Sequence, residues 1–204
     1  MNDDVYWNNF YKIKPLLHIP TQFAAFTANE IASGCQIIEL GCGNGRDALF
    51  FGRHGFSVYA IDSSSEAIKS CREKAQDGET FEVFDIVNNE LWAEIHRRTQ
   101  SSETIIYSRF FLHALEDEQQ VTMLKNLSIL QNKTRIFLEF RTKKDAERQK
   151  VTAKHFRNFI DLGKFEKLLL KFNFSVINTW TGLGYAKFKT DDAHVARYIL
   201  EVNS

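Results

Sequence analysis

One stretch in the first third of the chain constrains the fold more than any other. The apolar run Ile37–Leu40 leads into the glycine-rich segment Gly41–Gly45, and a second apolar run, 58–61, ends on Asp62. A strand, a glycine-rich turn, a helix and a second strand closed by a carboxylate form a βαβ unit that suits an adenosine-containing ligand. The glycines let backbone approach the ligand, and the carboxylate can accept hydrogen bonds from ribose hydroxyls.

The spacing of the glycines separates two classes of ligand. A dinucleotide site requires G-x-G-x-x-G, because a helix N-terminus must press against a pyrophosphate, but Arg46 stands where the third glycine should be. A nicotinamide oxidoreductase is therefore the less favoured alternative. The glycines stand instead at positions 41, 43 and 45, with Glu39 two residues before the first. Together with Asp62, this run resembles motif I and the acidic loop after it in class I S-adenosylmethionine-dependent methyltransferases.

That resemblance implies S-adenosyl-L-methionine as the cofactor, with the glycine turn under its methionine portion and Asp62 on its ribose. Asp85 closes the third apolar run, at the position from which such enzymes bind the adenine amino group, and Ile86 would pack on the ring. A helix cap is the structural alternative for Asp85. The expected cofactor-binding residues are Glu39, Gly41, Cys42, Gly43, Asn44, Gly45, Arg46, Asp62, Ser63, Asp85, Ile86, Ser108 and Arg109.

Short β-rich runs alternate with helical patterns from residue 36 onward, which is typical of a parallel sheet covered on both faces. Ser63 and Glu66 have the spacing of a helix capping box. The sequence predicts an α/β fold, a three-layer sandwich around a seven-stranded, mostly parallel sheet. The resemblance adds that the seventh strand runs antiparallel. The predicted strands are 36–41, 57–62, 81–85, 104–109, 134–140, 174–181 and 195–202.

The length of 204 residues fits one domain, 1–204, with an α/β core at 36–204. Residues 1–35 are rich in aromatic side chains and are predicted to form an N-terminal helical lid, with Tyr6 and Trp7 as substrate contacts. A lid would exclude water from methyl transfer. The alternative is a pair of amphipathic helices that only pack on the sheet.

The amino-acid composition limits which partners and which cellular compartment are expected for this chain. Lysine plus arginine equals aspartate plus glutamate, 26 each, so a broad nucleic-acid footprint is not expected. The three cysteines show no C-x-x-C pair, and no basic-then-apolar leader or long apolar run is present. We therefore expect a cytoplasmic protein without a metal site or membrane insertion. The sequence leaves its oligomeric state open.

The segment 104–113 follows the pattern of a strand that ends at the active site of such a sheet. Enzymes that methylate amino groups of nucleic acids carry Asn/Asp-Pro-Pro-Tyr/Phe here, whereas this chain has Ser-Arg-Phe-Phe from Ser108. An oxygen nucleophile on a small molecule is therefore favoured. Arg109 is a candidate cation for an anionic group, and His113 is a candidate general base. Alternatively, His113 only orients a loop.

A basic segment follows the predicted fifth strand. Positions 141–157 hold seven lysines and arginines against two acids. Such a run is often a solvated face, but its start at a strand's carboxyl end suggests an anionic acceptor. Arg141, His155 and Arg157 are the candidate substrate contacts, with His155 a second candidate catalytic residue, and Tyr185 is a further substrate contact.

These features predict a methyltransferase that transfers a methyl group to an oxygen of a small acceptor by in-line displacement. The acceptor is expected to be anionic, phosphorylated or carboxylated, as in the bacterial methyltransferases of cell-surface saccharides or secondary metabolites that the chain resembles. The alternatives are a catalytically silent protein that binds S-adenosylmethionine and a nucleic-acid methyltransferase.

Overall fold

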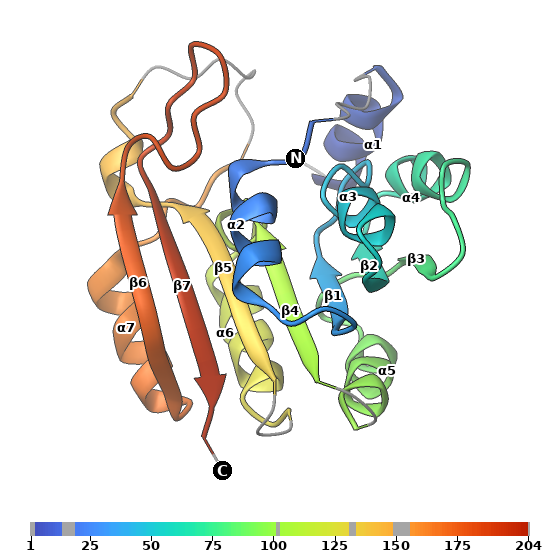
Figure 1. Cartoon of the computed structure of the whole chain (residues 1–204). Helices are drawn as coiled ribbons and strands as arrows, with labels where there is room; N and C mark the ends of the chain where they lie inside the picture. Colours follow the sequence, from blue (N-terminus) through green and yellow to red (C-terminus); the bar gives the residue numbers. More distant parts are fainter. Residues whose placement is uncertain (1–2, 14–18, 101–102, 131–133, 149–155, 204) are drawn as a thin grey trace.

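A seven-stranded sheet in the order β3-β2-β1-β4-β5-β7-β6 forms the centre of the protein (Figure 1). The structure is a computed structural model and describes residues 3–13, 19–100, 103–130, 134–148 and 156–203. Strand β7 lies antiparallel between β5 and β6, and the other described pairings are parallel, as the resemblance implied. The strands are β1 Gln36–Leu40, β2 Ser57–Asp62, β3 Glu79–Val83, β4 Thr104–Arg109, β5 Arg135–Arg141, β6 Phe174–Gly182 and β7 Val195–Val202.

Helices cover both faces of this sheet, which confirms the predicted three-layer sandwich. Side chains alternate along each strand, so Ile37 packs with α2, α3 and α4, whereas Ile38 packs with α5, α6 and α7. The helices are α1 Asp3–Ile13, α2 Gln22–Glu30, α3 Ala48–Arg53, α4 Ser65–Arg72, α5 Asn89–Thr99, α6 Asp117–Leu127 and α7 Leu162–Lys171, with 3₁₀ turns η1 Leu112–Ala114 and η2 Lys143–Asp145.

Two local expectations need correction. The third strand ends at Val83, because Asp85 has already turned out of the sheet and accepts a hydrogen bond from the Val87 amide at 3.1 Å. Helix α4 is capped by Ser64 instead of Ser63: the Ser64 hydroxyl accepts from the Ala67 amide at 3.2 Å.

The expected lid divides into two parts. Helix α2 belongs to the core, since Phe23 is buried and its ring lies 5.0 Å from that of Tyr107. Helix α1 lies at the carboxyl ends of the parallel strands (Figure 1). Its Asn8 side chain accepts hydrogen bonds from the Ser64 hydroxyl at 2.7 Å and the Glu66 amide at 3.3 Å. Only α1 is therefore placed as a cover.

No helix in the described part of the chain combines the length and the apolar composition needed to cross a membrane.

Candidate functional site

A cavity of about 350 Å³ lies at the carboxyl ends of the parallel strands, within the size range of small-molecule sites. One part, here called the donor end, is lined from β1, β2 and the segment after β3 by Glu39, the glycine turn, Asp62 and Asp85. The other part, the acceptor end, lies at β4 and β5. It is lined by Arg109, Phe110, His113, Arg141, Arg157 and Asp191.

The glycine turn is fixed to the end of β2 by backbone hydrogen bonds. Gly41, Gly43 and Gly45 all have positive φ, at 75°, 55° and 79°. The Gly41 amide donates to the Ile61 carbonyl at 2.9 Å, and the Gly43 amide donates to the Asp62 carboxylate at 2.8 Å. A second amide, from Ser64, donates to Asp62 at 2.9 Å. The Asp62 carboxylate is thus held in one orientation at the cavity wall.

Glu39 is a buried carboxylate with an unfilled acceptor. The residue is 3% exposed, and its Oε2 has no hydrogen-bond partner among the residues that the structure describes. Burial first, and then the neighbouring Asp47, raise the pKa of Glu39 well above its usual value. A carboxylate that is buried in this way is costly unless a donor or a cation meets it. It therefore suits a ligand that brings a positive charge.

Two aromatic side chains lie close to the glycines. A methyl group in place of the Gly43 hydrogen would stand within 3 Å of the Tyr11 hydroxyl, and one at Gly41 would overlap Phe111. Burial, followed by the charge of Asp62, raises the pKa of Tyr11 well above its usual value. Sequence reasoning did not single out Tyr11, although the aromatic run of the N-terminal segment was the available signal.

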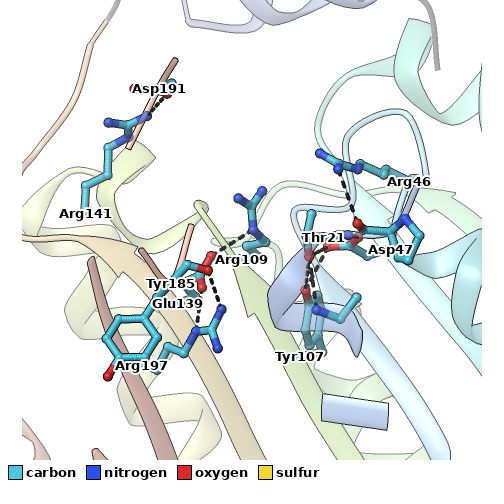
Figure 2. Close-up of polar contacts among 12 residues, drawn as sticks. Thr21, Arg46, Asp47, Tyr107, Arg109, Glu139, Arg141, Tyr185, Asp191 and Arg197 are labelled. Atoms are coloured by element: carbon cyan, nitrogen blue, oxygen red, sulfur yellow. Dashed lines mark hydrogen bonds and ion pairs between the residues drawn. The ribbon is translucent and has the colours of Figure 1, made fainter. Parts of the chain in front are cut away.

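A buried hydrogen-bond cluster connects the glycine turn to α2 and β4. Asp47 is 4% exposed and accepts from the Thr21 hydroxyl at 2.7 Å, the Thr21 amide at 2.9 Å and the Tyr107 hydroxyl at 2.8 Å (Figure 2). Arg46 lines the cavity and donates to the Ile19 carbonyl at 2.7 Å. These hydrogen bonds hold the start of α2 against the end of the glycine-rich segment.

At the acceptor end, Glu139 lies between two arginines (Figure 2). Its fully buried carboxylate accepts from Arg109 Nε at 2.8 Å and from Arg197 Nε at 2.7 Å. Burial alone would lower the pKa of Arg109, but the Glu139 charge raises it above its usual value. Arg109 therefore stays charged at the cavity wall, and its other nitrogens point away from Glu139 (Figure 2).

Arg141 is also paired within the protein. Its guanidinium donates to Asp145 at 2.6 Å and to Asp191 at 3.1 Å. Arg157 is half-buried nearby, where burial first and then the charge of Arg141 lower its pKa. The predicted basic segment thus brings two arginines to the cavity. Arg141 lines the cavity with its guanidinium already paired to two carboxylates.

Phe110 and His113 complete the acceptor end. Phe110 has φ 56°, a conformation rare for a side chain of this size, and the guanidinium carbons of Arg109 and Arg141 lie 4.1 and 5.0 Å from its ring centre. His113 is 4% exposed, and its Nδ1 accepts from the Arg141 amide at 3.2 Å.

The structure brings together most of the predicted site residues and separates a few. Ser108 is buried in the central strand β4 and donates to the Leu40 carbonyl, and Tyr185 packs on Arg197. Neither of these residues, nor Gly45 or Tyr6, is among the cavity-lining residues. His155 lies outside the described residues. The predicted residues that line the cavity are Trp7, Glu39, Gly41, Cys42, Gly43, Asn44, Arg46, Asp62, Ser63, Asp85, Ile86, Arg109, His113, Arg141 and Arg157.

Comparisons with known proteins find similarity to methyltransferases. A family model described as a methyltransferase domain matches residues 37–132. An S-adenosylmethionine-dependent methyltransferase from Anabaena variabilis has a TM-score of 0.74 and 17% identity, over 98% of this chain and 93% of that one. A TehB-like methyltransferase from Corynebacterium glutamicum has a TM-score of 0.66 and 16% identity, over 99% and 97%. No curated protein matches the chain.

The matched domain spans the glycine turn, Asp62 and the first four strands. The match covers slightly less than half of the chain, and the solved structures show that the chain shares the fold of S-adenosylmethionine-dependent methyltransferases.

Proposed function

We propose that this protein transfers the methyl group of S-adenosylmethionine to an oxygen of a small anionic acceptor. The observation that carries the proposal is one continuous cavity that joins an acidic donor end to an arginine-lined acceptor end. When bound, S-adenosylmethionine supplies a methyl group on a sulfonium, which needs only a nucleophile held in line with the carbon–sulfur bond.

The residues of the donor end fit this donor. S-adenosylmethionine carries an ammonium and a sulfonium and no phosphate, and Glu39 is a buried acid with an oxygen that lacks a partner among the described residues. Asp62 would accept from the ribose hydroxyls, and Asp85 and Ile86 would bind adenine. Arg46 is the candidate for the methionine carboxylate.

The acceptor end supports an anionic acceptor by its charge. Four arginines gather there, Arg109, Arg141, Arg157 and Arg197, against the acids Glu139, Asp145 and Asp191. Two arginines, Arg109 and Arg157, line the cavity from different segments, so they can bind one carboxylate or phosphate from two sides. Phe110 and Trp7 offer apolar contact to the rest of the acceptor.

The proposal is tested with S-adenosylmethionine that carries a tritiated methyl group, by measuring which compounds become labelled. A cell extract is separated into protein, nucleic acid, neutral small molecules and anionic small molecules, and each fraction is incubated with the enzyme. We expect label in the anionic fraction. Arg157→Gln should lower that incorporation by about tenfold, as expected for one lost charged hydrogen bond, while the exposed Lys167→Gln should not. Label confined to RNA or to protein would overturn the proposal.

A further inference from the structure

We infer that the oxygen that takes the methyl group belongs to the ionised group itself, a carboxylate or a phosphate, so that the product is a methyl ester. This inference rests on the proposed function and sharpens its substrate class. Two observations at the acceptor end carry it: the way in which His113 is hydrogen-bonded, and the pairing of the carboxylates around it.

A neutral hydroxyl and an ionised oxygen make different demands on the site. A hydroxyl must lose its proton as it attacks, so a side chain with an available lone pair must lie within hydrogen-bond reach. An ionised oxygen already carries its lone pair. It needs only cations that hold it in place.

His113 is bonded in a way that opposes the role of general base. Strand β5 continues past the last β4 pair, Arg109 with Glu139, so the Arg141 amide faces the β4 side beyond the end of that strand. His113 Nδ1 accepts this amide at 3.2 Å. A neutral imidazole has one acceptor nitrogen, so the proton of His113 sits on Nε2. The neutral side chain is then a hydrogen-bond donor at Nε2 and has no second lone pair for an acceptor's proton.

The same residue also fixes the segment that carries Arg157. The His113 carbonyl accepts a hydrogen bond from the Asn158 amide at 2.8 Å. His113 therefore joins the end of β5 to the segment 156–160, and both place an arginine at the cavity. These contacts give His113 a positioning role.

The carboxylates of the described acceptor end are already bound to cations. Glu139 accepts from two arginines, Asp191 accepts from Arg141, and Asp145 accepts from Arg141 and from the His194 amide. Each of these acids serves to hold an arginine. The described acceptor end thus supplies arginines, acids that are paired with them, and a histidine whose Nδ1 lone pair is already used.

The chemistry balances without a proton acceptor. A lone pair of the anionic oxygen forms the new O–CH₃ bond as the S–CH₃ bond breaks, and the electron pair of that bond stays on sulfur. The negative charge of the oxygen and the positive charge of the sulfonium disappear together. The products are a neutral carboxylic or a singly charged phosphate methyl ester, according to the acceptor, and S-adenosylhomocysteine.

The test uses the full chain, methyl-labelled S-adenosylmethionine and matched acceptors that share a skeleton: glucose, glucuronate and glucose 1-phosphate, and benzyl alcohol, benzoate and benzyl phosphate. Label in a carboxyl ester returns as volatile methanol in alkali, and label in a phosphate ester is released by phosphodiesterase. Label that resists both treatments is a methyl ether, and it would overturn the inference. Binding of S-adenosylmethionine, measured separately by calorimetry, tells failure of the proposed function from failure of this inference alone.

Two measurements test the role of His113 directly: the dependence of kcat/KM on pH below neutrality, and the activity of a conservative variant. With a carboxylate acceptor, we expect kcat/KM to change little between about pH 7.5 and pH 5.5, since carboxylates ionise near pH 4. His113→Asn keeps an acceptor for the Arg141 amide but cannot take up a proton, and it should lose less than about tenfold in kcat. A loss of about 100-fold or more, together with a rate that falls below about pH 6.5, would show a general base and contradict the inference.

Discussion

At the donor end of the cavity, the buried acid Glu39 has one carboxylate oxygen, Oε2, without a partner among the described residues. At the acceptor end, the acids Glu139, Asp145 and Asp191 are each paired with an arginine. Substitution of these paired acids should therefore disturb the fold, whereas substitution of Glu39 should disturb ligand binding. A charged residue in a site can therefore either bind the ligand or stabilise the fold.

The largest effect is expected at Glu139. Glu139→Ala leaves Arg109 and Arg197 without their shared buried carboxylate and should lower the free energy of unfolding by about 3–5 kcal/mol. The control is Glu103→Ala, which removes an exposed ion pair with Arg135 at 3.3 Å and should cost less than about 1 kcal/mol. Urea denaturation measures both. Equal losses in the two variants would show that the Glu139 carboxylate does not stabilise the acceptor end.

A smaller effect is expected at the glycine turn. Gly43→Ala places a Cβ at φ 55° and against the Tyr11 hydroxyl, so it should cost about 2 kcal/mol and displace α1 from the donor end. Gly55→Ala is the matched control, because its φ is 84° but nothing lies within 4 Å of the new Cβ. It should cost about 1 kcal/mol and leave S-adenosylmethionine binding unchanged. If both variants bind the ligand like the native protein, the close packing of Tyr11 on Gly43 has no role in the site.

The smallest expected effect has the opposite sign. Burial raises the pKa of Glu39 above its value in the unfolded chain, so its contribution to stability is full at acidic pH and is lost as the pH rises through the folded-state pKa. At pH 7, Glu39→Gln should therefore raise the free energy of unfolding, by about 1 kcal/mol, and flatten its pH dependence. The same variant should weaken S-adenosylmethionine binding. Thermal unfolding across pH checks the first point, and lower stability of the variant at pH 7 would contradict it.

The sequence predicted the donor end of the site in more detail than the acceptor end. Most of the donor end comes from two short segments, 37–47 and 58–62, whose spacing alone indicates a turn and a facing acid. The strands were predicted within two residues, because apolar runs and glycine turns are local signals.

The acceptor end could not be predicted to the same depth. Glu139 binds Arg109, which is 30 residues away in the sequence, and Arg197, which is 58 residues away. Arg141 and its partner Asp191 are 50 residues apart. Which cation is neutralised depends on the strand order and on the hairpin between β6 and β7, and neither is a local property. The resemblance to a family supplied the antiparallel seventh strand, but it did not supply these pairs. For the same reason Tyr11 was not singled out, since its contact with Gly43 depends on how α1 docks.

The most direct test of the account is a calorimetric titration with S-adenosylmethionine of the native protein, Asp62→Ala and Asp77→Ala. Asp77 is an exposed acid on the turn between α4 and β3 and serves as the matched control. The native protein and Asp77→Ala should bind equally, and Asp62→Ala should bind at least about 100-fold more weakly, as loss of charged hydrogen bonds worth about 3 kcal/mol implies. No binding by the native protein, or equal binding by Asp62→Ala, would contradict the account.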